Sequence, residues 1–260
     1  MESKRLAFIE TRDGVVGALD FAQRTMVQYR RAVLNSRKRG STKPSHGSLP
    51  EYRKGFIESY LSFKKYIKEH SQKELVIFDI DDTLFTTSAR VIVMSGWFEV
   101  TRLSTQEYND YILQPGEMFD YSEFVSAKYF NESSIVIEDT MKLAKDIYRE
   151  QIFHPCSKMI LLTARGDFDN KNLFLDTFRK YNFPIDYVYV ERVGGQAGTP
   201  ANKKVEVIRR YLDSGKYDIL KFFDDSVKNL EAVVDIVKFY PNIKIKTYLC
   251  KNAEITVHSK

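Results

Sequence analysis

The stretch that decides the fold is Leu75-Val76-Ile77-Phe78-Asp79-Ile80-Asp81-Asp82-Thr83-Leu84-Phe85. Its apolar beginning is typical of a strand that is buried on both faces of a parallel sheet. Carboxylates that follow such a strand lie at the carboxyl edge of the sheet, where open α/β folds bind ligands. Packing alone does not explain three crowded acids, because they repel one another and raise one another's pKa. The pattern therefore predicts a bound cation, and a divalent metal is the simplest candidate.

The spacing of the acids suggests two different roles. Asp79 and Asp81 project to the same side of an extended backbone, because side chains alternate along it. One carboxylate can attack a phosphorus atom as a nucleophile while the other handles the proton of the leaving group. Mg²⁺ between the first carboxylate and a phosphate oxygen would offset the repulsion between two anions. The alternative is a loop whose acids only cap a helix.

Length and composition indicate a large α/β protein. The chain has 260 residues, of which 43% are hydrophobic, enough for one large domain or for a core domain with a smaller insertion. Cys156 and Cys250 are far apart and give neither a metal-binding spacing nor a disulfide framework. The first residues lack the apolar segment of a secretion signal, and no stretch approaches the length of a membrane span. These features predict a cytoplasmic protein that makes no use of a membrane.

The positive charge is concentrated near the N-terminus. Residues 1–70 hold 15 Lys and Arg against 7 Asp and Glu, whereas residues 71–260 hold 25 against 28. Apolar spacing over residues 5–35 and 51–70 predicts two helices, so we expect residues 1–70 to be a basic helical extension. This extension can attract a nucleic-acid backbone, or its charges can be ordinary solvated helix faces.

Beyond Phe85 the pattern predicts an insertion and then a regular alternation. Residues 90–100 predict a hairpin that turns at Ser95-Gly96, a capping box at Ser104 and Glu107 predicts a helix that starts at Thr105 and ends by Pro115-Gly116, and a helix is expected near residues 137–149. Strands are then expected at residues 158–162, 187–190, 219–223 and 243–250, with helices at 170–181, 203–212 and 230–239. This alternation predicts a parallel sheet with right-handed connections. We expect residues 71–85 and 158–260 to form the core domain and residues 86–157 an inserted cap.

Two more predicted strands end in polar residues. Thr163 follows one of them and can donate to a phosphate oxygen, with help from free amides in the next turn, or can simply cap that turn. Asp224 and Asp225 end another strand, and two further carboxylates at the sheet edge again call for a cation. The alternative for this pair is a solvated acidic turn.

A third signal lies at the start of a predicted helix. Thr199 and Pro200 suit its cap and its first position. A lysine in the first turn is unfavourable against the helix dipole, so Lys203 or Lys204 is expected to face an anion. The two cannot both point inward, and we favour Lys203.

Together these segments resemble the haloacid dehalogenase superfamily over about residues 73–250. The resemblance rests on Asp79-Ile80-Asp81-Asp82-Thr83, then Thr163, then Lys203 or Lys204, and then Asp224-Asp225. It implies a Rossmann-like parallel sheet of that superfamily's type, with a cap inserted after the first strand. The cap would exclude water and read the part of the substrate that is not phosphate.

The resemblance also implies a role for each site residue. Asp79 would be the nucleophile that forms an aspartyl-phosphate, and Asp81 the general acid and then base. Thr163 and Lys203 would complete the catalytic set, and substrate binding would fall to Thr83, Ala164, Arg165 and Lys204. Mg²⁺ would be held by Asp79, by the backbone carbonyl of Asp81, and by Asp225 with Asp224 near it.

An aspartate at position 81 looks like a phosphatase or phosphomutase, because hydrolysis needs a proton donor for the leaving group. The residues of these motifs are similar to those of nucleotidases and of phage-type polynucleotide 3′-phosphatase domains. We therefore expect a Mg²⁺-dependent phosphomonoesterase that acts on a nucleotide or on a nucleic-acid phosphate end. The alternatives are a non-catalytic nucleic-acid-binding protein on the same scaffold and a phosphatase of a non-nucleotide metabolite. Aromatic residues of the insertion can stack on a base or form the insertion's own core; they are Trp97, Phe98, Tyr108, Tyr111, Phe119 and Tyr121.

Overall fold

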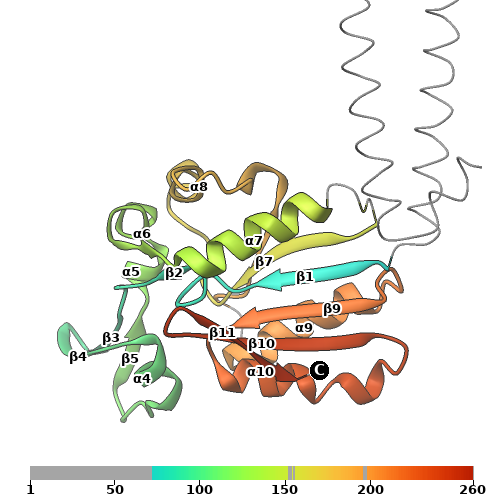
Figure 1. Cartoon of the computed structure of the whole chain (residues 1–260). Helices are drawn as coiled ribbons and strands as arrows, with labels where there is room; N and C mark the ends of the chain where they lie inside the picture. Colours follow the sequence, from blue (N-terminus) through green and yellow to red (C-terminus); the bar gives the residue numbers. More distant parts are fainter. Residues whose placement is uncertain (1–71, 152–153, 155, 196–197, 260) are drawn as a thin grey trace, which may run out of the picture. The chain divides into compact units, whose positions relative to one another are not determined.

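The computed structural model describes residues 72–151, 154, 156–195 and 198–259, which are coloured in Figure 1. The helices predicted over residues 5–35 and 51–70, and with them the basic extension, lie outside the described residues. None of the helices in the described part combines the length and the hydropathy that crossing a bilayer requires.

The centre of the described part is a six-stranded sheet with the strand order β11-β10-β9-β1-β7-β8. Its strands are β1 (Glu74–Phe78), β7 (Lys158–Thr163), β8 (Tyr189–Arg192), β9 (Ile219–Asp224), β10 (Lys244–Lys251) and β11 (Glu254–Ser259). The first five of these pair in parallel, whereas β11 runs antiparallel to β10. The protein therefore has the mixed α/β architecture with a mostly parallel sheet that its alternating pattern predicts.

The prediction missed β11, because it ended the last strand at Cys250. β10 and β11 are joined by a tight turn in which Asn252 and Ala253 both have positive φ, 54° and 61°. Such turns suit the twist of a hairpin and are usually marked by Asn-Gly or Asp-Gly. Alanine rarely adopts this conformation, so the sequence carried little local signal for the hairpin.

Four helices cover the two faces of the sheet. They are α7 (Glu138–Gln151), α8 (Lys171–Arg179), α9 (Pro200–Leu212) and α10 (Val227–Val234). Figure 1 shows α7 and α8 on one face and α9 and α10 on the other. Val76 and Phe78 of β1 pack in the cluster on the α7 side, and Leu75 and Ile77 pack in the cluster on the α9 side. Burial on both faces is the reason that β1 is a continuous apolar run.

Two elements differ from the prediction in their bounds. The strand expected at residues 187–190 begins later, because Ile185–Tyr187 forms the short 3-10 helix η1. The helix expected at residues 230–239 starts earlier, as α10, and is followed by a separate 3-10 turn, η2 (Val237–Phe239).

The insertion leaves the core at β2 (Phe85–Thr86) and returns at β6 (Ile135–Val136), and these two strands pair with each other. Between them lie β3 (Val91–Ser95), β4 (Phe98–Leu103), α4 (Thr105–Asp110), β5 (Glu117–Asp120), α5 (Ser122–Val125) and α6 (Ala127–Ser133). The predicted hairpin is β3–β4, and the predicted capping box of Ser104 and Glu107 starts α4. The helix ends at Asp110, ahead of the predicted Pro115-Gly116.

Part of the predicted cap, residues 86–157, packs with the main core. A separate small core exists only around Val91, Val93 and Leu103. Met141 and Ala144 of α7 pack instead in the main core with β1. The amphipathic pattern of α7 predicted a helix correctly, but it does not say which core the apolar face meets. From here on, the cap means residues 87–125, which lie at the carboxyl end of β1 in Figure 1.

Candidate active site

A cavity of about 830 Å³ lies between the carboxyl edge of the sheet and the cap. The core contributes Asp79, Asp81 and Asp225, together with residues from the loops after β7 and β8 and from the first turns of α9 and α10. The cap contributes residues of α4 and α5, among them Tyr108 and Phe124. The predicted acids of two separate strands therefore meet in one concave site, as the rule for open α/β sheets expects.

Three carboxylates converge at the floor of this cavity. Phe78 of β1 pairs in register with Phe223 of β9, so Asp79 and Asp224 follow side by side on adjacent strands. Asp79, Asp224 and Asp225 each offer an oxygen within 4.8 Å of the others. Asp79 and Asp224 are buried, so this cluster differs from the exposed acidic groups that are common on protein surfaces.

Lys204 lies between two of these carboxylates. Its Nζ is 2.7 Å from Asp79 Oδ1 and 2.7 Å from Asp224 Oδ2, and the side chain is buried. Our preference for Lys203 was wrong. Lys204 shares the buried stripe of α9 with Val207 and Ile208, at the helical spacing of three and four residues. Lys203 sits beside that stripe, half-buried, and lines the cavity.

The charges of the cluster do not cancel. When all three carboxylates are ionised, they and the one ammonium leave an excess of two negative charges. Burial raises the pKa of Asp79 well above its ordinary value; Lys204 opposes this rise, and Asp224 and Asp225 add to it. Burial and the charge of Asp224 raise the pKa of Asp225 to about 8. Burial lowers the pKa of Lys204, but Asp224 and Asp79 outweigh it, so its pKa is raised overall.

The protein's own donors occupy Asp224. Its Oδ1 accepts hydrogen bonds from the backbone N–H of Ser226 and from Asn229 Nδ2, each at 2.9 Å, while Oδ2 accepts from Lys204. Apart from the backbone N–H of Asp225 itself, none of the described residues donates a hydrogen bond to the carboxylate of Asp225 or to Asp79 Oδ2. These oxygens are suited to bind a cation, and the contacts of Asp224 are suited to orient Lys204. That Asp224 is itself a metal ligand stays a prediction, since its carboxylate also belongs to the group of acids that could hold an ion. Asn229 was not predicted, although it lies only four residues beyond Asp225.

Arg165 lines the cavity and is bound to Asp81. Its Nη2 is 2.7 Å from Asp81 Oδ1, and its Nε is 2.9 Å from Asp81 Oδ2. The guanidinium is almost fully buried. The prediction that Arg165 binds substrate stays a prediction: the side chain lines the cavity, and in this arrangement its donors have protein partners. Ala164, which was also predicted to bind substrate, does line the cavity.

Two predicted hydroxyl groups lie beneath the site. Thr163 is fully buried; its Oγ1 accepts from the backbone N–H of Arg165 at 3.1 Å and is 3.5 Å from Asp81 Oδ2. Thr163 therefore caps the turn after β7, which is the alternative that the sequence analysis gave for it. Thr83 is fully buried as well and is not among the residues that line the cavity, so its part in substrate binding stays a prediction. Asp82, directly before it, has a left-handed conformation with φ of 55°.

Asp82 links the loop after β1 to the cap. Its carboxylate accepts hydrogen bonds from the Thr87 backbone N–H at 3.2 Å and from Thr105 Oγ1 at 2.9 Å. Burial raises the pKa of Asp82. The third acid of the motif therefore holds the cap, while the first two face the cavity.

The six aromatic residues proposed for base stacking separate into three groups. Trp97 and Phe98 stand at the tip of the β3–β4 hairpin, 95% and 79% exposed. Tyr111 and Phe119 pack against the small core of the cap. Tyr108, which also packs against that core, and Tyr121 line the cavity, and their hydroxyl groups are 2.9 Å apart.

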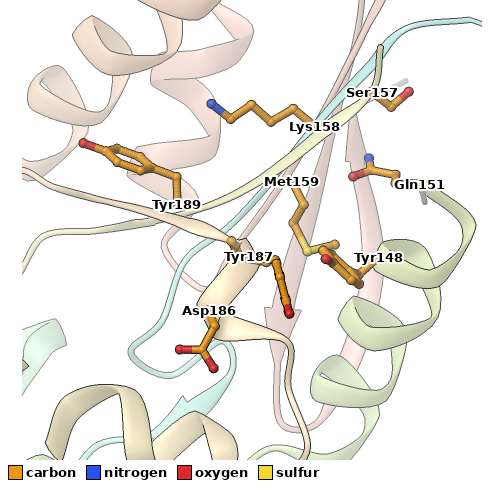
Figure 2. A pocket seen from close by; sticks show the side chains of 9 residues that line it. Tyr148, Gln151, Ser157, Lys158, Met159, Asp186, Tyr187 and Tyr189 are labelled. Carbon is orange, nitrogen blue, oxygen red and sulfur yellow. The ribbon is translucent and has the colours of Figure 1, made fainter. Parts of the chain in front are cut away.

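A second cavity, of about 440 Å³, lies near the start of β7, at the opposite end of the strand from Thr163. Figure 2 shows Tyr148, Tyr187 and Tyr189 around it, together with Lys158. Asp186, the carboxylate in its lining, forms an ion pair with Arg179. The described lining thus brings no group of acids together, and the larger cavity is the candidate active site.

Comparison of the chain with models of known protein families, and with curated proteins, found no match.

Proposed function

We propose that this protein is a Mg²⁺-dependent phosphomonoesterase that works through an aspartyl-phosphate intermediate. The observation that carries the proposal is the buried cluster of Asp79, Asp224 and Asp225 around Lys204, on the floor of a large cavity. An enzyme that takes a phosphoryl group needs a nucleophile, cations for the phosphate oxygens and a proton donor close together.

The donor set fits magnesium. Carboxylate oxygens are the ligands that Mg²⁺ prefers, and Asp79 Oδ2 and Asp225 offer oxygens that accept no hydrogen bond from any other described residue. With all three carboxylates ionised, the excess of two negative charges matches one dication. Asp79 and Asp225 would hold the ion, the backbone carbonyl of Asp81 is the third ligand that the resemblance implies, and Asp224 would orient Lys204. When bound, Mg²⁺ would neutralise charge on the phosphate that meets these acids.

The residues of the site divide the reaction into two displacements. In the first, an Asp79 oxygen forms a bond to phosphorus as the bond from phosphorus to the ester oxygen breaks, and Asp81, which must enter this step protonated, gives its proton to the departing oxygen. In the second, Asp81 takes a proton from a water molecule whose oxygen attacks the same phosphorus. Phosphate leaves, and the carboxylate of Asp79 is restored. Lys204 stays charged and offsets negative charge beside Asp79.

The resemblance to the haloacid dehalogenase superfamily supports this proposal. The four motifs follow the order of that superfamily, and they bring Asp79, Asp81, Lys204 and Asp224-Asp225 to one edge of a mostly parallel sheet. The resemblance assigned a lysine to the site, and the buried position of Lys204 is consistent with that assignment.

A nucleotide or a nucleic-acid phosphate end is the substrate that we favour. The cavity is in the size range of sites for drug-sized ligands. Tyr108 and Tyr121 face it from the cap and can stack on a base. A role for the basic residues 1–70 in nucleic-acid binding stays a prediction, since they lie outside the described residues.

The test is hydrolysis of p-nitrophenyl phosphate with Mg²⁺ and with EDTA. We expect turnover that EDTA abolishes and added Mg²⁺ restores. Asp79→Asn should remove turnover and leave the fold intact, whereas Asp235→Asn, at an exposed acid on the C-terminal end of α10, should keep it. Wild-type turnover in Asp79→Asn would exclude the covalent mechanism, and turnover that EDTA leaves unchanged would exclude the metal.

A panel of 3′- and 5′-nucleotides, phosphorylated oligonucleotides and sugar phosphates then tests the substrate class. Equal rates for substrates with and without a nucleobase would refute the proposal that the substrate is a nucleotide.

A further inference from the structure

Arg165 connects the proposed proton donor to the cap. On one side, its guanidinium donates to both carboxylate oxygens of Asp81, at 2.7 to 3.1 Å. On the other side, Nη1 donates to the backbone carbonyl of Phe124 in α5 at 3.0 Å, and the guanidinium carbon lies 4.6 Å from the centre of the Phe124 ring. Nη2 also donates to Thr87 Oγ1 at 3.0 Å, where the chain enters the cap.

The surroundings leave this side chain little freedom. The Arg165 side chain is 1% exposed, and the rings of Phe130 and Phe168 lie 4.8 and 5.5 Å from its guanidinium carbon. A planar guanidinium that meets a carboxylate with two parallel donors fixes the plane of that carboxylate as well as its position. A lysine ammonium would supply the charge without fixing the plane. The orientation of Asp81 therefore follows the orientation of Arg165.

We infer that Arg165 is a positioning residue that couples the place of the cap to the orientation of Asp81. The inference rests on the proposed function, in which Asp81 protonates the leaving group. Phe124 and Thr87 belong to the cap, so a cap that moves away withdraws two of the groups that hold the guanidinium. The carboxylate of Asp81 is then no longer aimed by the same contacts. Proton transfer to the leaving group thereby becomes dependent on a cap closed over the cavity.

A comparison of two esters tests this inference. p-Nitrophenolate is a weak base and leaves with little need of a proton, whereas the alkoxide of glycerol 2-phosphate needs one. Arg165→Lys should therefore reduce kcat for glycerol 2-phosphate about 10- to 100-fold more than kcat for p-nitrophenyl phosphate, part of the effect of a general acid. KM should change little for either ester. Arg179→Lys, the same substitution in an exposed ion pair, should change neither.

Two other roles for Arg165 predict different results. A residue that binds the substrate phosphate would raise KM for both esters together. A residue that only supports the fold would lower both rates equally, in proportion to the folded fraction measured by circular dichroism. Either result would overturn the inference. Asp81→Asn should show the same preference for p-nitrophenyl phosphate, and its combination with Arg165→Lys should add little, because the two residues act as a unit.

A second variant keeps the test decisive if Arg165→Lys does not fold. Phe124→Leu removes the ring that stacks on the guanidinium but leaves the backbone carbonyl in place. It should shift the ratio of the two rates in the same direction by a smaller factor, and an unchanged ratio would contradict the coupling. If the wild-type protein hydrolyses neither ester with Mg²⁺, the proposed function fails. If it hydrolyses both and the variants lose both equally, only the role of Arg165 fails.

Discussion

Raising the pH from 6 to 8 should strengthen Mg²⁺ binding steeply, because Asp225 must lose its proton to become a ligand. Burial, followed by the charge of Asp224, raises the pKa of this carboxyl group to about 8 in the metal-free protein. Metal ligands bind in their deprotonated form, so at lower pH the ion has to displace a proton. Binding of Mg²⁺ therefore releases a proton from Asp225, and the fraction of protein molecules that release one is larger at lower pH.

The expected magnitude follows from the ionised fraction of Asp225. With a pKa of about 8, roughly 1% of the group is ionised at pH 6 and about half at pH 8. The apparent affinity for Mg²⁺ should then rise about 50-fold over this range, which corresponds to about 2.3 kcal/mol. The pKa of Asp79 is also raised, so a second proton would make the dependence steeper.

Isothermal titration calorimetry measures the affinity for Mg²⁺ and the number of protons released on binding. Titrations of Mg²⁺ at pH 6, 7 and 8, each in two buffers of different ionisation enthalpy, give the affinity and the number of protons released. Asp225→Asn should abolish most of the pH dependence and weaken binding at pH 8, while Asp235→Asn should retain both. An affinity that stays constant between pH 6 and 8, without proton release, would refute the reasoning.

The same shift in pKa has a consequence for stability. An unfolded aspartate loses its proton near pH 4, whereas folded, metal-free Asp225 keeps it up to about pH 8. The folded state then binds more protons than the unfolded state over this window, so the free energy of unfolding falls as the pH rises through it. Thermal unfolding in EDTA should show this fall, and Mg²⁺ should stabilise the protein more at pH 8 than at pH 6.

Three substitutions should have specific effects on stability and activity. Lys204→Met leaves Asp79 and Asp224 without their shared cation, so it should cost about 3 to 5 kcal/mol of unfolding free energy in urea and abolish turnover, whereas Lys203→Met should cost less than about 1 kcal/mol. Gly194→Ala places a Cβ 2.2 Å from the backbone nitrogen of Gly166, so it should displace that loop at a cost of about 1 to 3 kcal/mol, while Gly166→Ala, whose Cβ meets atoms no closer than 3.9 Å, should be tolerated. Asn229→Ala removes a donor to buried Asp224 Oδ1 and should cost about 1 to 3 kcal/mol; a cost below about 0.5 kcal/mol would show that water replaces the amide.

Local sequence patterns were sufficient to predict those features that depend on residues close together in the sequence. The apolar run that becomes β1 is continuous because both faces of the strand are buried, and the acids that follow it must emerge at the sheet edge. The capping box of Ser104 and Glu107 forms as expected, because its two hydrogen bonds join residues three apart. The amphipathic spacing of α9 even contained the information that Lys204, rather than Lys203, shares the buried stripe.

Contacts between distant residues decided the rest. Lys204 is 125 residues away from Asp79 in the sequence, and Arg165 is 84 residues away from Asp81. No local pattern states which acid each cation will meet, because that depends on the order in which β7, β1 and β9 join the sheet. The place of α7 could not be predicted for the same reason: its apolar face fits either core, and only packing selects one. Strand and helix positions follow from short-range periodicity, whereas the pairing of charges follows from the free energy of burying them together, which exists only in the folded chain.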